Sequence, residues 1–308
     1  MKLDTELAGI KLKNPTILAS GILGNTGEIL KRVATEGGAG AVTTKSIGED
    51  ARTGHGNATI VDMGKIMLNA MGLPNPGATA FVDEIKIAKE AKVPVIASIF
   101  GSSVEGYAAV AKKVLAAKPD MIEINMSCPH AKGHGASFGS DEETAGQVVK
   151  AVKKVSGKTP VFAKLTPNVV SISAIAKAVE NAGADGITAI NTLGPGVVID
   201  VETASPVLSN VAGGLSGEAI KPIAVRCVYE IYKTVKIPII GTGGVYTGLD
   251  AAEMLMAGAS AVGIGTAVKD REIDVFSKIC KELSDFMERK NYKSVKDLVG
   301  LAHRRIQK

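Results

Sequence analysis

A thiol and a side-chain amide follow an apolar run near the middle of the chain. Residues 121–124 form the run, Asn125 ends it, and Cys128 and Pro129 come soon after. A buried strand that delivers polar groups and a thiol at its carboxyl end is how parallel α/β enzymes present reactive side chains. A thiol titrates near pH ~8.5, and nearby cations lower that value. Cys128, with His130 as a nearby imidazole, could therefore act as a nucleophile or a general base; the alternative is a small apolar side chain in a turn.

Apolar runs that stop at small or polar residues recur along the whole chain. They cover residues 16–21, 41–46, 93–99, 121–124, 161–165, 186–190, 237–240 and 261–264. Eight strand–helix units in one domain-sized chain predict a (β/α)8 TIM barrel over residues 1–308. An open doubly wound sheet is the alternative, but it seldom needs eight similar units. We expect a short hairpin in residues 3–12, with Gly9 at its turn, to close the bottom of the barrel.

Helical patterns fill the connections between these runs. They cover residues 28–36, 106–117, 142–155, 172–182, 219–235, 248–257, 273–287 and 293–299. We expect His303, Arg304 and Arg305 to form a solvated tail. The connections 47–91 and 193–215 are too long for simple crossovers, and we expect them to form functional loops on the C-terminal face of the barrel.

The composition is typical of a globular enzyme, with 45% hydrophobic residues, 22% charged residues and 35 glycines. The net charge of +5 is modest, and the absence of a Lys/Arg run argues against nucleic-acid binding. No apolar run is long enough to span a bilayer, and residues 1–5 lack a signal-peptide pattern, so we expect no membrane attachment. Cys128, Cys227 and Cys280 form neither a CxxC motif nor a disulfide framework, which favours the reducing cytoplasm. Cys227 and Cys280 fall in helical patterns and are expected to pack in the core.

In such a barrel the carboxyl ends of the strands converge on one site. These ends carry lysines, amides, hydroxyls, one thiol and glycine turns, but no carboxylate pair and no metal-ligand spacing. This lining suits an anionic, planar ligand held without a metal. The glycine turns 241–244 and 263–266 follow the last two runs, where barrels commonly bind phosphate through backbone N–H groups aided by a helix N-terminus. They do not match a dinucleotide-binding fingerprint, which comes earlier and is followed by an acidic residue.

Two lysines stand at strand ends. Lys164 lies between Ala163 and Leu165 in an apolar run, and a buried lysine without a partner is uncommon. It could form a Schiff base with a substrate, or it could hold positive charge against an anionic cofactor. Lys45 presents the same choice. Two lysines in one site favour charge compensation.

Together these segments resemble class 1 dihydroorotate dehydrogenases over essentially the whole chain. Residues 125–129 resemble the catalytic loop of that family, and residues 164–168 resemble its flavin-lysine strand. Residues 69–77 resemble the substrate loop, and residues 213–217 and 241–244 resemble the segments that bind the flavin phosphate. Any one of these motifs alone is weak, whereas the set is highly specific.

The resemblance implies a role for each matching residue. FMN would be held by Ser20, Lys45, Ser46, Ser98, Asn125, Lys164, Ile190, Gly217, Gly243, Gly244, Gly265 and Thr266. Dihydroorotate would be held by Lys45, Asn69, Ala70, Met71, Gly72, Leu73, Asn125, Asn191 and Thr192. Cys128 would act as the general base that takes the proton from C5 while hydride passes from C6 to flavin N5. Lys164 would stabilise the negative charge of the reduced flavin.

The resemblance also implies partners. A cysteine base is similar to class 1, whereas the membrane class uses serine, and the loop 69–77 and residues 52–54 are most similar to subclass 1B. Enzymes of that subclass work with a second subunit that carries FAD and a [2Fe–2S] cluster and passes electrons to NAD, which implies a heterotetramer built on a homodimer. This chain departs from the family pattern at His130 and Ser98, where asparagine is usual. An imidazole can donate or accept a hydrogen bond but cannot do both as an amide can.

Three other interpretations remain open from the residues. An FMN barrel similar to tRNA dihydrouridine synthase would call for an RNA-binding domain and a basic face. A Schiff-base aldolase would use Lys164 as its nucleophile. A flavin-carrying scaffold would leave the thiol near the substrate-type loop without a role.

Overall fold

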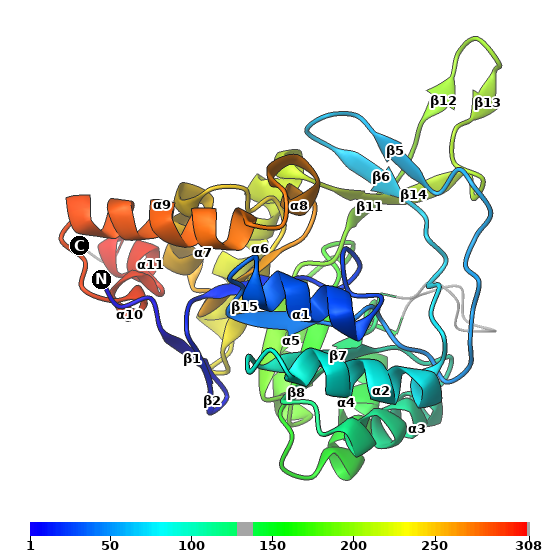
Figure 1. Ribbon diagram of the computed structural model, residues 1–308, viewed down its shortest axis with the longest axis horizontal. Coiled ribbons are helices and arrows are strands. Elements are labelled where there is room, and N and C mark those ends of the chain that lie inside the picture. The colour runs from blue at the N-terminus through cyan, green and yellow to red at the C-terminus, as the bar shows by residue number, and fades with distance from the viewer. Residues whose placement is uncertain (128–137, 307–308) are drawn as a thin grey trace.

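Eight parallel strands close into a barrel in the computed structural model, which describes residues 1–127 and 138–306 (Figure 1). In barrel order they are β3 (Thr16–Leu18), β4 (Ala41–Thr43), β7 (Val95–Ile99), β8 (Met121–Asn125), β9 (Val161–Leu165), β10 (Gly186–Ala189), β15 (Ile239–Thr242) and β16 (Ala261–Ile264). Each apolar run of the sequence overlaps one of these strands. The predicted (β/α)8 TIM barrel is confirmed.

Helices surround the barrel and follow its strands (Figure 1). They are α1 (Gly27–Thr35), α2 (Ala78–Lys89), α3 (Val104–Val114), α4 (Glu142–Ser156), α5 (Ile172–Asn181), α6 (Lys221–Thr234), α7 (Gly248–Ala257), α8 (Ala267–Arg271) and α9 (Val275–Arg289), with 3₁₀ turns η1 (Leu115–Ala117) and η2 (Glu218–Ile220) beside α3 and α6. Thr26, Ser103, Asp141, Ser171 and Thr247 cap helix N-termini by accepting a backbone N–H. Such caps set where a helix begins, because the first N–H groups have no partner inside the helix.

The apolar residues of the strands form two separate cores. Alternate side chains of a strand point to opposite faces, so one set faces the helices and the other faces the barrel interior. Ile122, Ile124 and Ala163 belong to the outer core, which the helices complete. Met121 and Phe162 belong to an inner core at the N-terminal ends of the strands. The inner core fills the barrel from below.

A hairpin of β1 (Thr5–Leu7) and β2 (Ile10–Leu12) closes this lower end. Leu7 and Leu12 are fully buried and pack into the inner core beside Met121 and Phe162. The predicted hairpin is confirmed.

The two long connections combine into one structure above the barrel. β5 (Ile60–Asp62) and β6 (Met67–Asn69) come from the first connection, and β11 (Leu193–Val197) and β14 (Ala212–Ser216) come from the second. They pair in the order β11–β14–β6–β5. A further hairpin of β12 (Ile199–Asp200) and β13 (Ser205–Pro206) projects from this sheet as an arm (Figure 1). The paired residues Asn69 and Gly214 are 145 positions apart in the sequence, so distant segments together cover the C-terminal face of the barrel.

The expectation of a solvated tail at His303 is wrong. After α10 (Val295–Leu298), helix α11 (Leu301–Ile306) covers the carbonyl end of α7. The Nε2 atom of His303 donates to the Ala257 carbonyl at 2.9 Å, and its ring stacks on Tyr229 at 3.8 Å between centroids. A capped carbonyl and a stacked ring hold this segment against the barrel, while Arg304 remains exposed.

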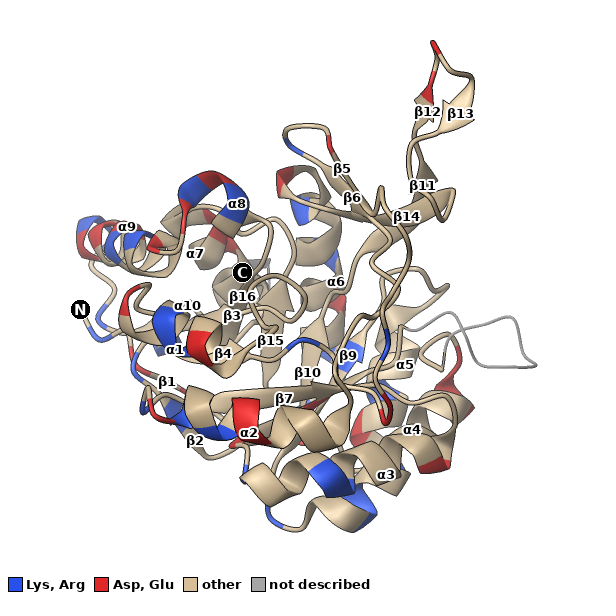
Figure 2. Ribbon diagram, turned by 45° about the vertical axis from the view of Figure 1, so that its right-hand side comes forward, with Lys and Arg blue, Asp and Glu red and all other residues tan. Residues whose placement is uncertain are grey.

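Two further expectations concern cysteines and the surface. Cys227 is fully buried, as predicted, whereas Cys280 is half-buried with its sulfur 3.9 Å from the Thr16 hydroxyl. Basic and acidic residues are interspersed along outer helices such as α8 and α9 (Figure 2). Within the described ranges, no helix combines the length and apolar character needed to cross a membrane.

Candidate active site

The barrel interior changes from apolar to polar along the strands. In the strand register Glu123 lies opposite Ser98, and Lys164 lies opposite both Asn125 and Thr188. All five are at most 9% exposed. Four of them follow an inner-core residue of their own strand by two or four positions, and Thr188 follows Gly186 by two. The same period that fills the lower barrel therefore delivers these polar groups above it.

Two buried ammonium groups and one carboxylate lie in this layer. Lys45 is 8% exposed and Lys164 is 5% exposed. The Nζ atom of Lys164 lies 3.7 Å from Oε1 of Glu123, whereas Lys45 has no acidic partner in the part of the chain that the structure describes. Burial lowers the pKa of Lys45, and the positive charge of Lys164 lowers it further. The layer therefore carries excess positive charge and suits an anion.

A chain of hydrogen bonds joins several of the predicted site residues. The Ser46 hydroxyl lies 3.1 Å from that of Ser98 and 3.4 Å from that of Ser20. Asn125 donates from Nδ2 to the Ser46 hydroxyl at 3.0 Å, and Asn191 donates from Nδ2 to Asn125 Oδ1 at 3.2 Å. The structure thus brings together side chains expected to hold the flavin ring and side chains expected to hold the substrate.

The substrate-type loop reaches the same place through the small sheet. Asn69 donates from Nδ2 to the Gly214 carbonyl at 3.3 Å, and a Cβ at Gly214 would lie 2.2 Å from the Thr192 hydroxyl. Asn69 and Thr192 therefore flank one glycine. His55 holds the next residues, because its Nδ1 lies 3.1 Å from the Ala70 carbonyl and its N–H donates to the Met71 carbonyl.

Gly72 and Leu73 complete that loop in left-handed backbone conformations, with φ of 73° and 57°. A Cβ at Gly72 would lie 2.6 Å from the His55 nitrogen, so glycine is required there. Leu73 packs against the outer core. Both residues of this turn are therefore in contact with neighbouring parts of the protein.

The predicted phosphate segments gather at the opposite end of the site. A Cβ at Gly243 would lie 3.5 Å from Ile190, and Thr266 donates from its hydroxyl to Ser216, the neighbour of Gly217, at 2.9 Å. The N–H groups of Gly243, Gly244 and Gly265 donate to no residue of the described ranges. A Cβ at Gly265 would meet no protein atom nearer than 3.6 Å, so its surroundings leave open space. Free N–H groups around open space form a cradle for an anion.

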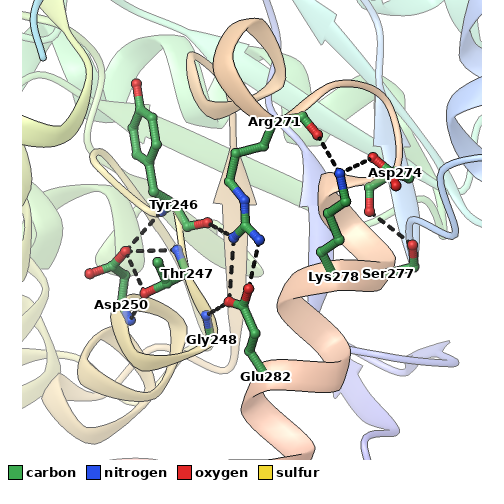
Figure 3. Close-up of polar contacts among 9 residues, drawn as sticks. All are labelled: Tyr246, Thr247, Gly248, Asp250, Arg271, Asp274, Ser277, Lys278 and Glu282. Atoms are coloured by element: carbon green, nitrogen blue, oxygen red, sulfur yellow. Dashed lines mark hydrogen bonds and ion pairs between the residues drawn. The ribbon is translucent and has the colours of Figure 1, made fainter.

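The N-terminus of α7 is closed to such an anion (Figure 3). Asp250 Oδ2 accepts the N–H groups of Tyr246 at 3.0 Å and Thr247 at 2.7 Å, and Glu282 Oε2 accepts the Gly248 N–H at 2.7 Å. Burial alone would raise the pKa of Asp250, but hydrogen bonds from side-chain and backbone donors hold that pKa below its ordinary value. Two carboxylates therefore occupy this helix end. The glycine turns that precede α7 and α8 remain as the expected place for a phosphate.

Three residues of the site were not predicted from the sequence, namely Glu123, Thr188 and Ser127. Glu123 accepts from the Ser98 hydroxyl at 3.1 Å and from the Thr188 hydroxyl at 3.0 Å. The buried Ser127 hydroxyl has no hydrogen-bond partner in the described ranges. Glu123 could have been recognised as a charged residue in the middle of the apolar run 121–124. Cys128, Pro129 and His130 lie outside the described residues.

The donors present fit a planar, anionic cofactor such as FMN. Neither the Lys45 nor the Lys164 ammonium donates a hydrogen bond within residues 1–127 and 138–306. These ammonium groups lie in the polar layer of the barrel interior, and the open glycine cradle follows β15 and β16. No group of three or more His, Cys, Asp or Glu side chains in the described ranges could hold a metal ion.

Comparison with known proteins gives one consistent result. The family model of dihydroorotate dehydrogenase matches residues 2–287. A protein of Methanosarcina mazei is 53% identical over 96% of this chain and 94% of its own length. Proteins of Methanocaldococcus jannaschii and Pyrococcus furiosus are 50% and 49% identical, each over at least 98% of both chains. All three are named dihydroorotate dehydrogenase B (NAD(+)), catalytic subunit.

Proposed function

The chain belongs to the dihydroorotate dehydrogenase family, and we propose that it oxidises (S)-dihydroorotate to orotate with FMN as the first electron acceptor. This reaction is a step of pyrimidine biosynthesis. The observation that carries the proposal is the pair of buried lysines, Lys45 and Lys164, of which only Lys164 pairs with a carboxylate, Glu123, within the described residues. Orotate and reduced flavin are both anions, so both would be stabilised by the excess positive charge.

FMN, when bound, would supply the redox chemistry as acceptor of the hydride that leaves C6 of the substrate. The chain would hold it through two groups of residues. Lys164 and Lys45 would supply positive charge to its ring, and Gly243, Gly244 and Gly265 would offer backbone N–H groups to its phosphate. The remaining residues proposed to contact FMN are Ser20, Ser46, Ser98, Asn125, Ile190, Gly217 and Thr266.

The substrate is proposed to lie between the flavin ring and the roof sheet, which is the sheet of β11, β14, β6 and β5 above the barrel. Asn69, Asn125, Asn191 and Thr192 would hold its amide and carboxylate groups, because Asn191 donates to Asn125, and Asn69 and Thr192 flank Gly214. The other proposed contacts come from Lys45, Ala70, Met71, Gly72 and Leu73. Amides suit a cyclic diamide, since each can donate and accept at once.

Cys128 is proposed as the general base at C5 of dihydroorotate. It follows Asn125, the last residue of β8, by three positions in the sequence. Its Sγ would take the C5 proton while hydride leaves C6 for the flavin, so the C5–C6 double bond would form. A base rather than a nucleophile agrees with the excess positive charge of Lys45 and Lys164, which suits anions.

The experiment follows the colour of the purified protein. We expect a yellow protein that is bleached by dihydroorotate under anaerobic conditions, with orotate formed in equal amount. Cys128→Ala should stay yellow and bleach very slowly, whereas Cys227→Ala, a matched change in the outer core, should bleach at the normal rate. A colourless protein with no affinity for FMN, or a yellow one that dihydroorotate leaves unchanged, would refute the proposal.

We also propose that this chain is the catalytic subunit of a larger complex. Relatives carry that description together with NAD(+) in their names. This chain lacks a dinucleotide fingerprint, so a second subunit with FAD and a [2Fe–2S] cluster would pass electrons to NAD on a homodimer of this chain. The arm and roof sheet carry exposed apolar side chains, namely Ile60, Val197, Ile199, Val201 and Val211. Exposed apolar groups that gather on one feature support a subunit contact.

The test of this partner is turnover of the isolated chain with different acceptors. We expect activity with an artificial dye and little with NAD or fumarate. NAD-linked turnover by the isolated chain would contradict the need for a second subunit. We further propose one FMN-binding domain over residues 1–308 and a cytoplasmic location, which the free thiols of Cys227 and Cys280 support.

A further inference from the structure

Glu123 is the one buried carboxylate beside the two lysines among the described residues. It is 3% exposed and projects from the middle of β8 into the barrel. Ser98 donates to its Oε1 at 3.1 Å, and Thr188 donates to its Oε2 at 3.0 Å. Lys164 Nζ lies 3.7 Å from Oε1, close enough for an ion pair but beyond hydrogen-bond distance. Both carboxylate oxygens are therefore fixed by hydroxyl groups, while the ammonium keeps its own donors free.

This arrangement divides two tasks between neighbouring side chains. A buried carboxylate that lacks hydrogen bonds or a cation is costly, and Glu123 has both. The hydroxyls of Ser98 and Thr188 hold it from β7 and β10, the strands on either side of β8 and β9. Its charge then holds the Lys164 ammonium at the level where Asn125 and Lys164 face each other.

The charge count of the site depends on Glu123. The titratable groups that face Lys164 within the described ranges are Glu123 on β8 and Lys45 after β4; β10 contributes the Thr188 hydroxyl. Two ammonium groups and one carboxylate leave a net charge of +1. Without the carboxylate the net charge is +2, and a ligand that becomes more negative on reduction would be held more strongly in its reduced form.

We propose that Glu123 is a positioning residue of the flavin site, which holds the Lys164 ammonium in place and cancels one lysine charge. Glu123 thereby sets how strongly the site prefers reduced over oxidised flavin. This inference rests on the proposed function, because it presumes that FMN occupies the site. It extends that function by assigning the balance of redox states to a side chain that need not touch the substrate.

The test is the midpoint potential of bound FMN in Glu123→Gln, measured at about pH 7, well below the ordinary lysine pKa of about 10.4. Glutamine keeps the shape, and the hydroxyls of Ser98 and Thr188 can turn to suit its amide. We expect reduced FMN to gain at least about tenfold in affinity relative to oxidised FMN, a rise in potential of ~30 mV or more for two electrons. An unchanged or lower potential would overturn the proposal.

A matched control lies at the other end of the same strand. Asp120 directly precedes β8 and pairs with Lys89 at 2.9 Å, about one third exposed. Asp120→Asn makes the same chemical change in a carboxylate–lysine pair far from the polar layer. Its potential should equal that of the unchanged protein, and an equal rise in both variants would assign the effect to general loosening of β8.

A double-mutant cycle with Lys164→Met tests whether Glu123 acts through Lys164. With Lys164 replaced, Glu123 has no ammonium to hold in place, so Glu123→Gln should then change the affinity ratio less than about threefold. An undiminished change in the Lys164→Met background would show a direct action of Glu123 on the flavin and overturn the positioning role.

Thr188→Val supplies a second route if Glu123→Gln fails to fold. Valine has a similar shape, and the change removes one donor to Glu123 while leaving its charge. We expect a smaller rise in potential than in Glu123→Gln, and none in the Lys164→Met background. Equal rises in Thr188→Val and Glu123→Gln would refute charge as the cause. A protein that binds FMN and reacts with dihydroorotate but fails these tests would leave the proposed function intact.

Discussion

Replacing Lys45 by methionine should stabilise the flavin-free protein while it damages the reaction. Lys45 is 8% exposed, and burial together with the charge of Lys164 lowers its pKa. Within the described ranges it has no acidic partner and donates no hydrogen bond from Nζ. Methionine has similar length and no charge. The substitution therefore removes an unfavourable buried charge without opening a large cavity.

The expected change in the Tm of Lys45→Met follows from its gain in stability and from the length of the chain. Replacing buried charged groups by apolar ones of similar volume stabilises proteins by about 1–4 kcal/mol where the site repacks well. Unfolding entropy of about 2.1 cal/mol/K per residue gives roughly 0.65 kcal/mol/K for 308 residues, so 1 kcal/mol shifts Tm by about 1.5 °C. We expect the Tm of flavin-free Lys45→Met to rise by about 2–6 °C.

The stabilisation should depend on pH in one direction. Because the folded state lowers the pKa of Lys45, the unfolded chain binds more protons between that lowered pKa and the ordinary value of 10.5. The stability of the unchanged protein therefore gains from Lys45 as pH rises through this window. The Tm difference between Lys45→Met and the unchanged protein should be largest near neutral pH and should shrink on approach to pH 10.5.

Thermal unfolding of the flavin-free proteins at several pH values is the assay. Lys89→Met is the control, because Lys89 is about one third exposed and pairs with Asp120; it should give no rise in Tm. With FMN restored, kcat/KM of Lys45→Met should fall by about 10²–10³-fold. A lower Tm for Lys45→Met near neutral pH, or a difference that grows with pH, would refute the reasoning.

Three further outcomes are expected. Cys128→Ala should keep bound FMN but slow its reduction by dihydroorotate about 10²–10⁴-fold in stopped-flow traces, and a normal rate would remove Cys128 as the base. Gly265→Ala should weaken FMN binding at least about tenfold by titration while the flavin-free Tm stays within 1–2 °C or so, because its Cβ would meet no protein atom nearer than 3.6 Å; unweakened binding would place the phosphate elsewhere. Thr247→Ala should cost about 1 kcal/mol of stability through loss of the α7 cap, with FMN content unchanged, and a loss of FMN would mean that this helix end binds the phosphate after all.

The barrel could be predicted because its signal repeats. Each strand is an apolar run that ends at glycine, amide or hydroxyl residues, and each helix pattern follows at a similar distance. A single run, such as residues 186–190, is ambiguous between strand and helix, but eight in the same rhythm are not. The same reasoning placed Lys45, Asn125 and Lys164 at one end of the barrel, since carboxyl ends of parallel strands converge.

The sheet above the barrel could not be predicted for the opposite reason. The pairing of β6 with β14 joins residues 67–69 to residues 214–216, and neither segment carries a strong alternating pattern. Their partner choice depends on where the barrel brings the two connections, which is a property of the whole fold. The packing of the C-terminal segment could not be predicted for the same reason. His303 contacts the Ala257 carbonyl and the Tyr229 ring, and both lie far away in the sequence.

Glu123 escaped sequence reasoning because its role depends on side chains from three other strands. The interior of the barrel shows why those charges can stay buried. Two residues below Lys164, the Phe162 ring lies opposite Glu123 on one side and Gly186 on the other. A Cβ at Gly186 would lie 2.2 Å from that ring, so glycine is needed to admit it. The ring, with Leu7 and Leu12 of the hairpin, forms a dry floor beneath the polar layer. A dry floor strengthens every electrostatic interaction above it, so a ligand that closes the mouth of the barrel would meet lysine charges that water screens weakly.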